Sequence, residues 1–248
     1  MGCERQHKGW AAMFADMVER AKNDGARSQT LSRGIQVLEV LAAADRPRTI
    51  DELAAELGVH RSIVYRIVRT LEDHRLVARD SAGRCAPGAG LAVLAHGVSR
   101  DLQSVAVPEL AAVAADLRMT CFVVVHDHGE CITLASVEPR RAAGTVAEHP
   151  GTRHPLEHGA PGVALLTLLG TEGMGAEVAE RVAQARRQGY ATSHDEVIPG
   201  LSSVAVPIAS RALTCAAVAV VYVSSDRSPE DVAERLQAAA NAIGAQIG

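Results

Sequence analysis

Aromatic residues are scarce in this chain of 248 residues, where Trp, Tyr and Phe together make up only 2%. Proteins that bind single-stranded nucleic acid stack its bases on aromatic side chains. The composition therefore argues against that class. It leaves open the recognition of duplex DNA, which is read by side-chain hydrogen-bond donors.

The sequence also lacks an apolar run of about 18 residues, the length of a transmembrane helix, and its N-terminus has no hydrophobic segment of the signal-peptide kind. The cysteines are odd in number, widely spaced and include no Cys-x-x-Cys pair (Cys3, Cys85, Cys121, Cys131, Cys215). This usage suits a reducing compartment better than a disulfide framework. We therefore expect a cytoplasmic protein without a membrane partner.

Length and composition fit two globular domains, because 248 residues with 48% hydrophobic content can bury a sizeable core. The net charge of −4 is unevenly spread. Residues 1–87 carry 14 basic and 12 acidic residues, whereas residues 88–248 carry 11 basic and 17 acidic residues. A basic N-terminal part is consistent with a nucleic-acid partner.

Residues 49–87 predict a winged helix-turn-helix. Thr49 and Glu52 form a Thr-x-x-Glu capping box, and the apolar residues that follow lie on one face of a short helix that Gly58 ends. A second helix over residues 60–74 has a buried stripe at helical spacing (Val64, Ile67, Val68, Leu71). Residues 76–86 then predict a hairpin. A helix over 32–43, capped by Ser32, completes the bundle.

The second of these helices has a polar face suited to the major groove. Arg66 and Arg69 can present planar forks of donors to guanine, whereas Ser62 and Tyr65 suit phosphates or single base contacts. Six arginines stand against three acids in residues 58–87. The simpler interpretation of any one arginine is a solvated surface charge. The predicted DNA-binding residues are Arg61, Ser62, Tyr65, Arg66, Arg69 and Arg84.

The rest of the chain predicts an α+β domain, a sheet covered by helices. We expect a linker helix over 91–103, a helix over 107–119 beginning near Pro108, and a hairpin of strands 120–126 and 130–137. A third strand is expected over 144–148. Helices are predicted over 158–169 and 174–188, strands over 201–210 and 214–223, and a terminal helix capped by Ser228.

These patterns resemble the IclR family of bacterial transcriptional regulators over roughly residues 32–248. The resemblance rests on Ser62-x-x-Tyr65-Arg66 in the N-terminal part, on Gly162-x-Ala164-Leu165-Leu166, and on a late signature of Glu196-x-x-x-Gly200 with Val204-Ala205-x-Pro207. It implies a winged helix-turn-helix (32–88), a linker helix (89–104) and a GAF-like effector-binding domain (105–248). Residues 1–31 form an N-terminal extension before the part that the resemblance covers.

The resemblance further implies a homodimer or dimer of dimers on double-stranded operator DNA, with a small organic acid or aromatic catabolite as effector. The expected pocket residues are Ala160, Pro161, Gly162, Ser193, Asp195, Leu201, Ser203, Tyr222 and Ser224. Hydroxyls and amides at a helix N-terminus suit a carboxylate. However, Ser193 stands where the family commonly has an acid, and the segment between Leu169 and Gly189 is short for the family.

Three alternatives stay open. Clustered histidines (His126 and His128 with Cys131; His149, His154 and His158) could hold zinc, although their spacing matches no strong pattern. Ser203 with Asp195 and a histidine could form a hydrolase site, but no Gly-x-Ser-x-Gly elbow is present. We expect neither an enzyme nor a cofactor. The rival class is a metabolite-binding or hydrolytic protein whose N-terminal module makes protein contacts.

Overall fold

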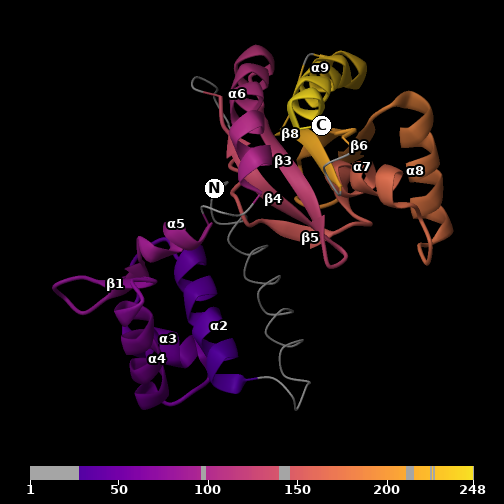
Figure 1. The fold of residues 1–248 in the computed structure, drawn as a ribbon. Coiled ribbons are helices and arrows are strands. Elements are labelled where there is room, and N and C mark those ends of the chain that lie inside the picture. The colour runs from indigo at the N-terminus through magenta and orange to yellow at the C-terminus, as the bar shows by residue number, and fades with distance from the viewer. Residues whose placement is uncertain are drawn as a thin grey trace. The chain divides into compact units, whose positions relative to one another are not determined.

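A computed structural model describes residues 28–95, 99–139, 146–210, 215–223, 225 and 227–247. The chain forms two compact units, Met1–Val98 and Ser99–Gly248. Their division falls inside the segment 89–104 predicted as a linker. The positions of the two units relative to one another are not determined (Figure 1).

The N-terminal unit is a winged helix-turn-helix, as predicted. It comprises α2 (Gln29–Ala43), α3 (Ile50–Leu57), α4 (Arg61–Asp73) and the antiparallel pair β1 (Val77–Arg79) and β2 (Cys85–Pro87). The capping box is present, because Thr49 Oγ1 accepts from the Glu52 N–H (3.2 Å) and the Thr49 N–H donates to the Glu52 carboxylate (2.7 Å). Gly58 ends α3 with φ of 63°. Leu53 and Val64 are fully buried in the core of the unit.

The start of this unit differs from the prediction. Helix α2 begins at Gln29 with Ser28 as its cap, one turn before the expected cap Ser32. The Ser28 hydroxyl accepts from the Leu31 N–H at 3.4 Å, and serines at both positions made the choice ambiguous from sequence. In the predicted N-terminal extension, apolar residues at helical spacing suggest a helix (Trp10, Met13, Phe14, Met17, Val18), but residues 1–27 lie outside the described residues.

The predicted linker helix over 91–103 is wrong as one helix. The structure has a short α5 (Gly90–Ala95) and a separate α6 (Arg100–Leu117). Ser99, with φ of 44°, precedes α6 in a left-handed conformation. Pro108 lies inside α6 instead of opening a helix, because buried residues continue through it from Leu102 to Leu110. Packing of this face thus outweighs the proline penalty of about 3 kcal/mol.

The C-terminal unit is built on one antiparallel sheet of six strands with the order β5-β4-β3-β8-β7-β6. The strands are β3 (Thr120–Asp127), β4 (Glu130–Val137), β5 (Arg153–Pro155), β6 (Ala191–His194), β7 (Ser202–Pro207) and β8 (Ala216–Tyr222). The β3–β4 hairpin is confirmed. No strand forms over 146–148; instead β5 pairs with β4, with His154 opposite Cys131.

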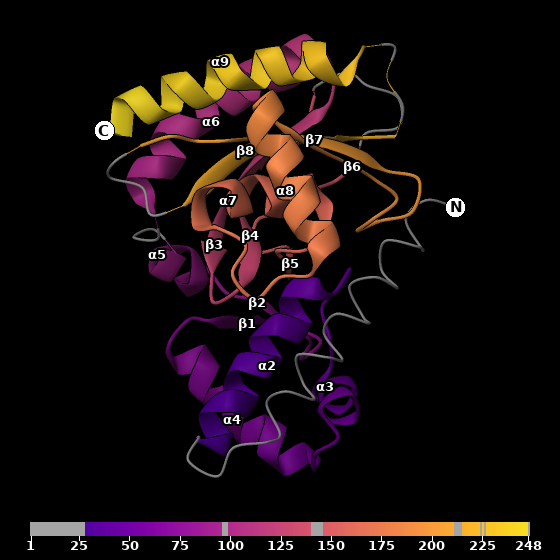
Figure 2. The ribbon, with the colours of Figure 1, turned by 90° about the vertical axis from the view of Figure 1, so that its right-hand side faces the viewer.

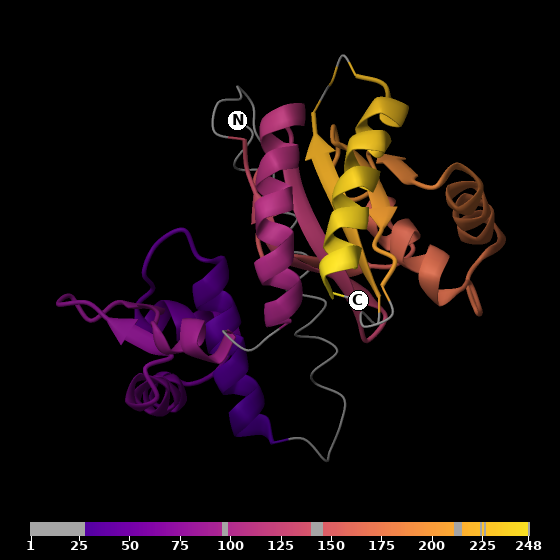
Figure 3. The same ribbon diagram turned by 45° about the horizontal axis from the view of Figure 1, so that its top comes forward.

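Helices cover both faces of this sheet. Helices α6 and α9 (Pro229–Ile247) lie side by side on one face (Figure 3). Helices α7 (Gly159–Leu169) and α8 (Ala176–Gln188) lie on the other face (Figure 2). Alternate residues of each strand point to opposite faces. Val220 accordingly packs with α6 and α9, whereas Val221 packs toward α7.

The terminal helix begins as predicted, since the Ser228 hydroxyl accepts from the Asp231 N–H at 3.1 Å. None of the helices among the described residues has both the length and the apolar character needed to cross a membrane.

Candidate functional site

Helix α4 presents two chemically distinct faces. Val64, Ile67 and Val68 are buried against the bundle. Five of the six predicted DNA-binding residues stand exposed on the same helix (Arg61, Ser62, Tyr65, Arg66, Arg69). Such a helix can place its donors in a major groove while its apolar side holds it in the unit.

Several of these side chains already have partners. Arg61 pairs with Asp51 of α3 at 2.9 Å, and the Ser62 hydroxyl lies 2.8 Å from His60 Nδ1. The Tyr65 hydroxyl bonds to Arg69 and raises the pKa of its guanidinium. The Arg66 guanidinium, in contrast, forms no ion pair with any described residue, although it is exposed in the middle of the helix. Arg66 is therefore the arginine of α4 best placed to contact a partner.

The sixth predicted residue, Arg84, lies in the hairpin that forms the wing. Its Nε donates to Asp80 at 2.8 Å, and its backbone N–H donates to the same carboxylate. The pairing lowers the pKa of Asp80. Within the unit, Arg84 thus stabilises the wing turn.

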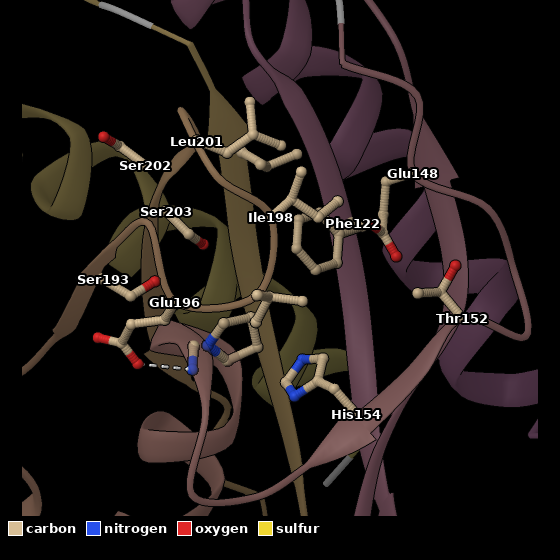
Figure 4. A pocket seen from close by; sticks show the side chains of 14 residues that line it. Phe122, Glu148, Thr152, His154, Ser193, Glu196, Ile198, Leu201, Ser202 and Ser203 are labelled. Atoms are coloured by element: carbon tan, nitrogen blue, oxygen red, sulfur yellow. Dashed lines mark hydrogen bonds between the residues drawn. The ribbon is translucent and has the colours of Figure 1, made fainter. Parts of the chain in front are cut away.

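The C-terminal unit contains a cavity of about 70 Å³ at the N-terminal end of α7 (Figure 4). Its walls come from β3, β5, α7, β6, β7, β8 and two loops. Its lining residues are Phe122, Glu148, Thr152, His154, Gly159, Pro161, Ser193, Glu196, Val197, Ile198, Leu201, Ser202, Ser203 and Val221.

Four predicted effector residues line this cavity, namely Pro161, Ser193, Leu201 and Ser203. Four others do not, and the reasons are geometric. Ala160 is fully buried, Gly162 packs against the backbone of Leu156, and Asp195 turns away to accept from the Gly200 N–H. Tyr222 packs toward the opposite face of the sheet. Ser224 lies outside the described residues.

The entry of α7 is capped by β6 and the loop that follows it. The Ala160 N–H donates to Ser193 Oγ (2.9 Å), and the Gly159 N–H donates to Glu196 (2.9 Å). Arg181 of α8 donates to both oxygens of Glu196, at 2.7 and 2.6 Å, and to the Glu157 carbonyl at 3.1 Å. Glu196 thus occupies the position where the sequence suggested a ligand carboxylate.

Replacing Arg181 by Gln should lower the free energy of unfolding by about 1–2 kcal/mol, because it leaves the partly buried Glu196 without its counter-charge. Denaturant unfolding would measure the change. Arg187→Gln is the matched control, since Arg187 and Glu180 form a pair whose side chains are 65% and 74% exposed. Such a pair contributes about 0–1 kcal/mol. Equal losses in the two variants would contradict the capping role of Arg181.

Three titratable groups of the cavity were missed as effector residues, namely Glu196, Glu148 and His154. Burial raises the pKa of Glu148 to about 7, against hydrogen bonds from Thr133 (2.8 Å) and Thr152 that favour its ionised form. Burial also lowers the pKa of His154, which keeps its imidazole neutral at pH 7. Glu148 is the last residue of a segment predicted as a strand, and His154 was considered only as a metal ligand. Neither position carried a local signal for the cavity.

The contacts of the histidines and of Ser203 bear on the metal-site and hydrolase alternatives. Among the described residues, no three His, Cys, Asp or Glu side chains form a group that could hold a metal ion. His126 Nε2 instead accepts from the Gly129 N–H at 3.1 Å. The Ser203 hydroxyl donates to the Val220 carbonyl at 2.8 Å, so it is not aligned with a histidine base.

Comparisons with known proteins agree across both units. The family model described as "IclR helix-turn-helix domain" matches residues 30–81, and "Bacterial transcriptional regulator IclR C-terminal" matches residues 174–247. The probable transcriptional regulator SauR of Cupriavidus necator is 26% identical over 226 residues, which cover 76% of this chain and 83% of that protein.

Solved structures show the same fold. An IclR transcriptional regulator from Alicyclobacillus acidocaldarius has a TM-score of 0.74 and 26% identity, covering 90% of this chain and all of that chain (100%). An IclR homolog from Microbacterium hydrocarbonoxydans, complexed with 4-hydroxybenzoate, has a TM-score of 0.77 and 23% identity, covering 88% and 99%.

Proposed function

Because this chain belongs to the IclR family of bacterial transcriptional regulators, we propose that it binds a specific operator through α4 and that a small molecule in the cavity modulates this binding. The first part rests on Arg66, which is exposed on α4 and forms no ion pair with a described residue. The cavity beside the capped entry of α7 supports the second. The proposed setting is the cytoplasm, where the protein would meet operator DNA.

We further propose that two copies act together, as a homodimer or a dimer of dimers. Half-sites lie about one helical turn apart, or multiples of it, so the spacing of two α4 helices sets operator affinity. An effector that binds one spacing better than another shifts that affinity. The resemblance to the family implies an organic acid or aromatic catabolite as effector, whereas none of the described residues lining the cavity is a lysine or arginine.

Arg66→Ala should weaken binding to the operator by about 1–3 kcal/mol and change binding to random DNA little, because a bidentate contact to guanine is lost. A shift assay on the intergenic DNA beside the gene, at two salt concentrations, would measure both. Arg187→Ala removes the same charge from an exposed site on α8 and should leave operator binding unchanged.

An equal loss of affinity for operator and random DNA would show that Arg66 contacts a phosphate and reads no base. Absence of any salt-sensitive DNA binding would favour the rival class, in which the N-terminal unit contacts proteins.

A further inference from the structure

One carboxylate of the cavity, Glu148, has no matching cation among the described residues. Two carboxylates, Glu148 and Glu196, line the cavity, and no lysine or arginine of the described chain does. Arg181 and the Gly159 N–H neutralise Glu196. Glu148 receives hydroxyl groups only, from Thr133 and Thr152, and pairs with no cation among the described residues. A bound ligand could supply the counter-charge that these residues do not.

The cavity also offers a ligand more hydrogen-bond acceptors than donors. The Ser203 hydroxyl has given its hydrogen to the Val220 carbonyl and can only accept from a ligand. A carbonyl can only accept, so the 3.0 Å contact to Pro155 requires the hydrogen of His154 on Nδ1, which leaves Nε2 of the neutral ring as an acceptor. Thr152 is engaged with Glu148. A ligand therefore meets more acceptors than donors.

The N-terminus of α7 does not supply the donors that the cavity lacks. The first two amides of α7 donate to Glu196 and Ser193. The third residue, Pro161, has no N–H. Ser193 keeps a hydroxyl hydrogen, but the amides that would bind an anion at a helix N-terminus are occupied.

The remaining walls are apolar, among them Phe122, Val197, Ile198 and Leu201. A cavity that holds benzene measures about 150 Å³, so the 70 Å³ found here favours a ligand smaller than a substituted aromatic ring. We propose that the cavity binds a small organic amine, with its ammonium group beside Glu148 and its hydrocarbon body against the apolar walls. This inference rests on the proposed function, which makes the cavity the effector site.

The ionisation of Glu148 supports the same ligand class. Burial raises the pKa of its carboxyl to about 7, because the site solvates the charged form poorly. A ligand ammonium would supply the missing charge and favour the ionised form. A ligand carboxylate would instead add a second unpaired negative charge to the cavity, which costs more.

The test compares three small molecules that share a branched four-carbon skeleton, namely isobutylamine, isobutanol and isobutyrate. Each is titrated into the full chain at pH 8 while the NMR signals of the cavity residues are followed. Isobutylamine should bind at least about tenfold more tightly than isobutyrate, because opposite and like charges differ by this much at partly buried sites.

Glu148→Gln should remove most of the preference for the amine and leave the binding of isobutanol nearly unchanged. Glu234→Gln makes the same change on an exposed residue of α9, which covers the opposite face of the sheet, and should alter nothing. Binding of isobutyrate as tight as that of isobutylamine, or amine binding that survives Glu148→Gln, would overturn the amine proposal alone. If none of the three shifts the signals of the cavity, the proposed effector site itself is wrong.

Discussion

Glu148→Gln is expected to raise the free energy of unfolding by up to about 3 kcal/mol at pH 8 and by less than about 1 kcal/mol at pH 5. The carboxyl has a folded-state pKa of about 7, against an ordinary value of 4.5. Between these values the folded chain holds a proton that the unfolded chain releases. The stability of the natural protein therefore falls as pH rises through this window.

The glutamine side chain of this variant would carry no charge to desolvate, and its carbonyl oxygen could still accept from Thr133. Urea unfolding followed by circular dichroism at pH 5, 6.5 and 8 would measure the effect. His154 and Glu196 line the same cavity, but both are present in the two proteins, so the difference between the proteins isolates Glu148. Glu234→Gln should show no such pH dependence. Parallel pH profiles for the natural protein and Glu148→Gln would show that Glu148 is ordinarily solvated.

Gly162→Ala should destabilise the C-terminal unit by about 3 kcal/mol, at the upper end of the usual cost of overpacking. A Cβ at this position would lie 2.3 Å from the Leu156 carbonyl oxygen and 2.9 Å from its carbon. These atoms belong to the backbone, so they cannot rotate away as a side chain would. The better helix propensity of alanine offsets about 1 kcal/mol at most.

Gly175→Ala is the matched control, since nothing lies within 4 Å of a Cβ built there and its φ of −66° is open to any residue. It should change the free energy of unfolding by less than about 1 kcal/mol. Thermal unfolding of both variants would separate them. If Gly162→Ala were as stable as the control, α7 and Leu156 would have to lie further apart than they do here.

The N-terminal unit was predictable because its signals are local. The capping box of Thr49 and Glu52, the glycine at position 58 and the apolar spacing of α4 each act over a few residues. The predicted start of α2 was wrong because Ser28 and Ser32 are equally good helix caps in sequence. The split between α5 and α6 failed because a proline is normally read as a helix start, whereas here packing holds it inside.

The cavity was less predictable because distant segments build it. Phe122, Glu148 and His154 come from a strand, a loop and a short edge strand that the sequence does not connect. Tyr222, a predicted effector residue, lies on the face of the sheet opposite the cavity. Its neighbour Val221 points into the cavity face, so Tyr222 must point to the other. Sequence pattern identified β8, but a strand buried on both faces has no polar alternation to fix its parity.

The order of the strands has a consequence for how the protein is made. Strand β3 sits beside β8 in the middle of the sheet, yet β8 begins only at Ala216, and α9, which packs on α6, follows it. During translation the C-terminal unit therefore cannot complete its sheet until β8 has left the ribosome. The helices and wing of the N-terminal unit contact near neighbours in sequence and can fold early. A chain truncated just before residue 216 would carry the N-terminal unit and a sheet without β8, whose unpaired strand edges favour aggregation.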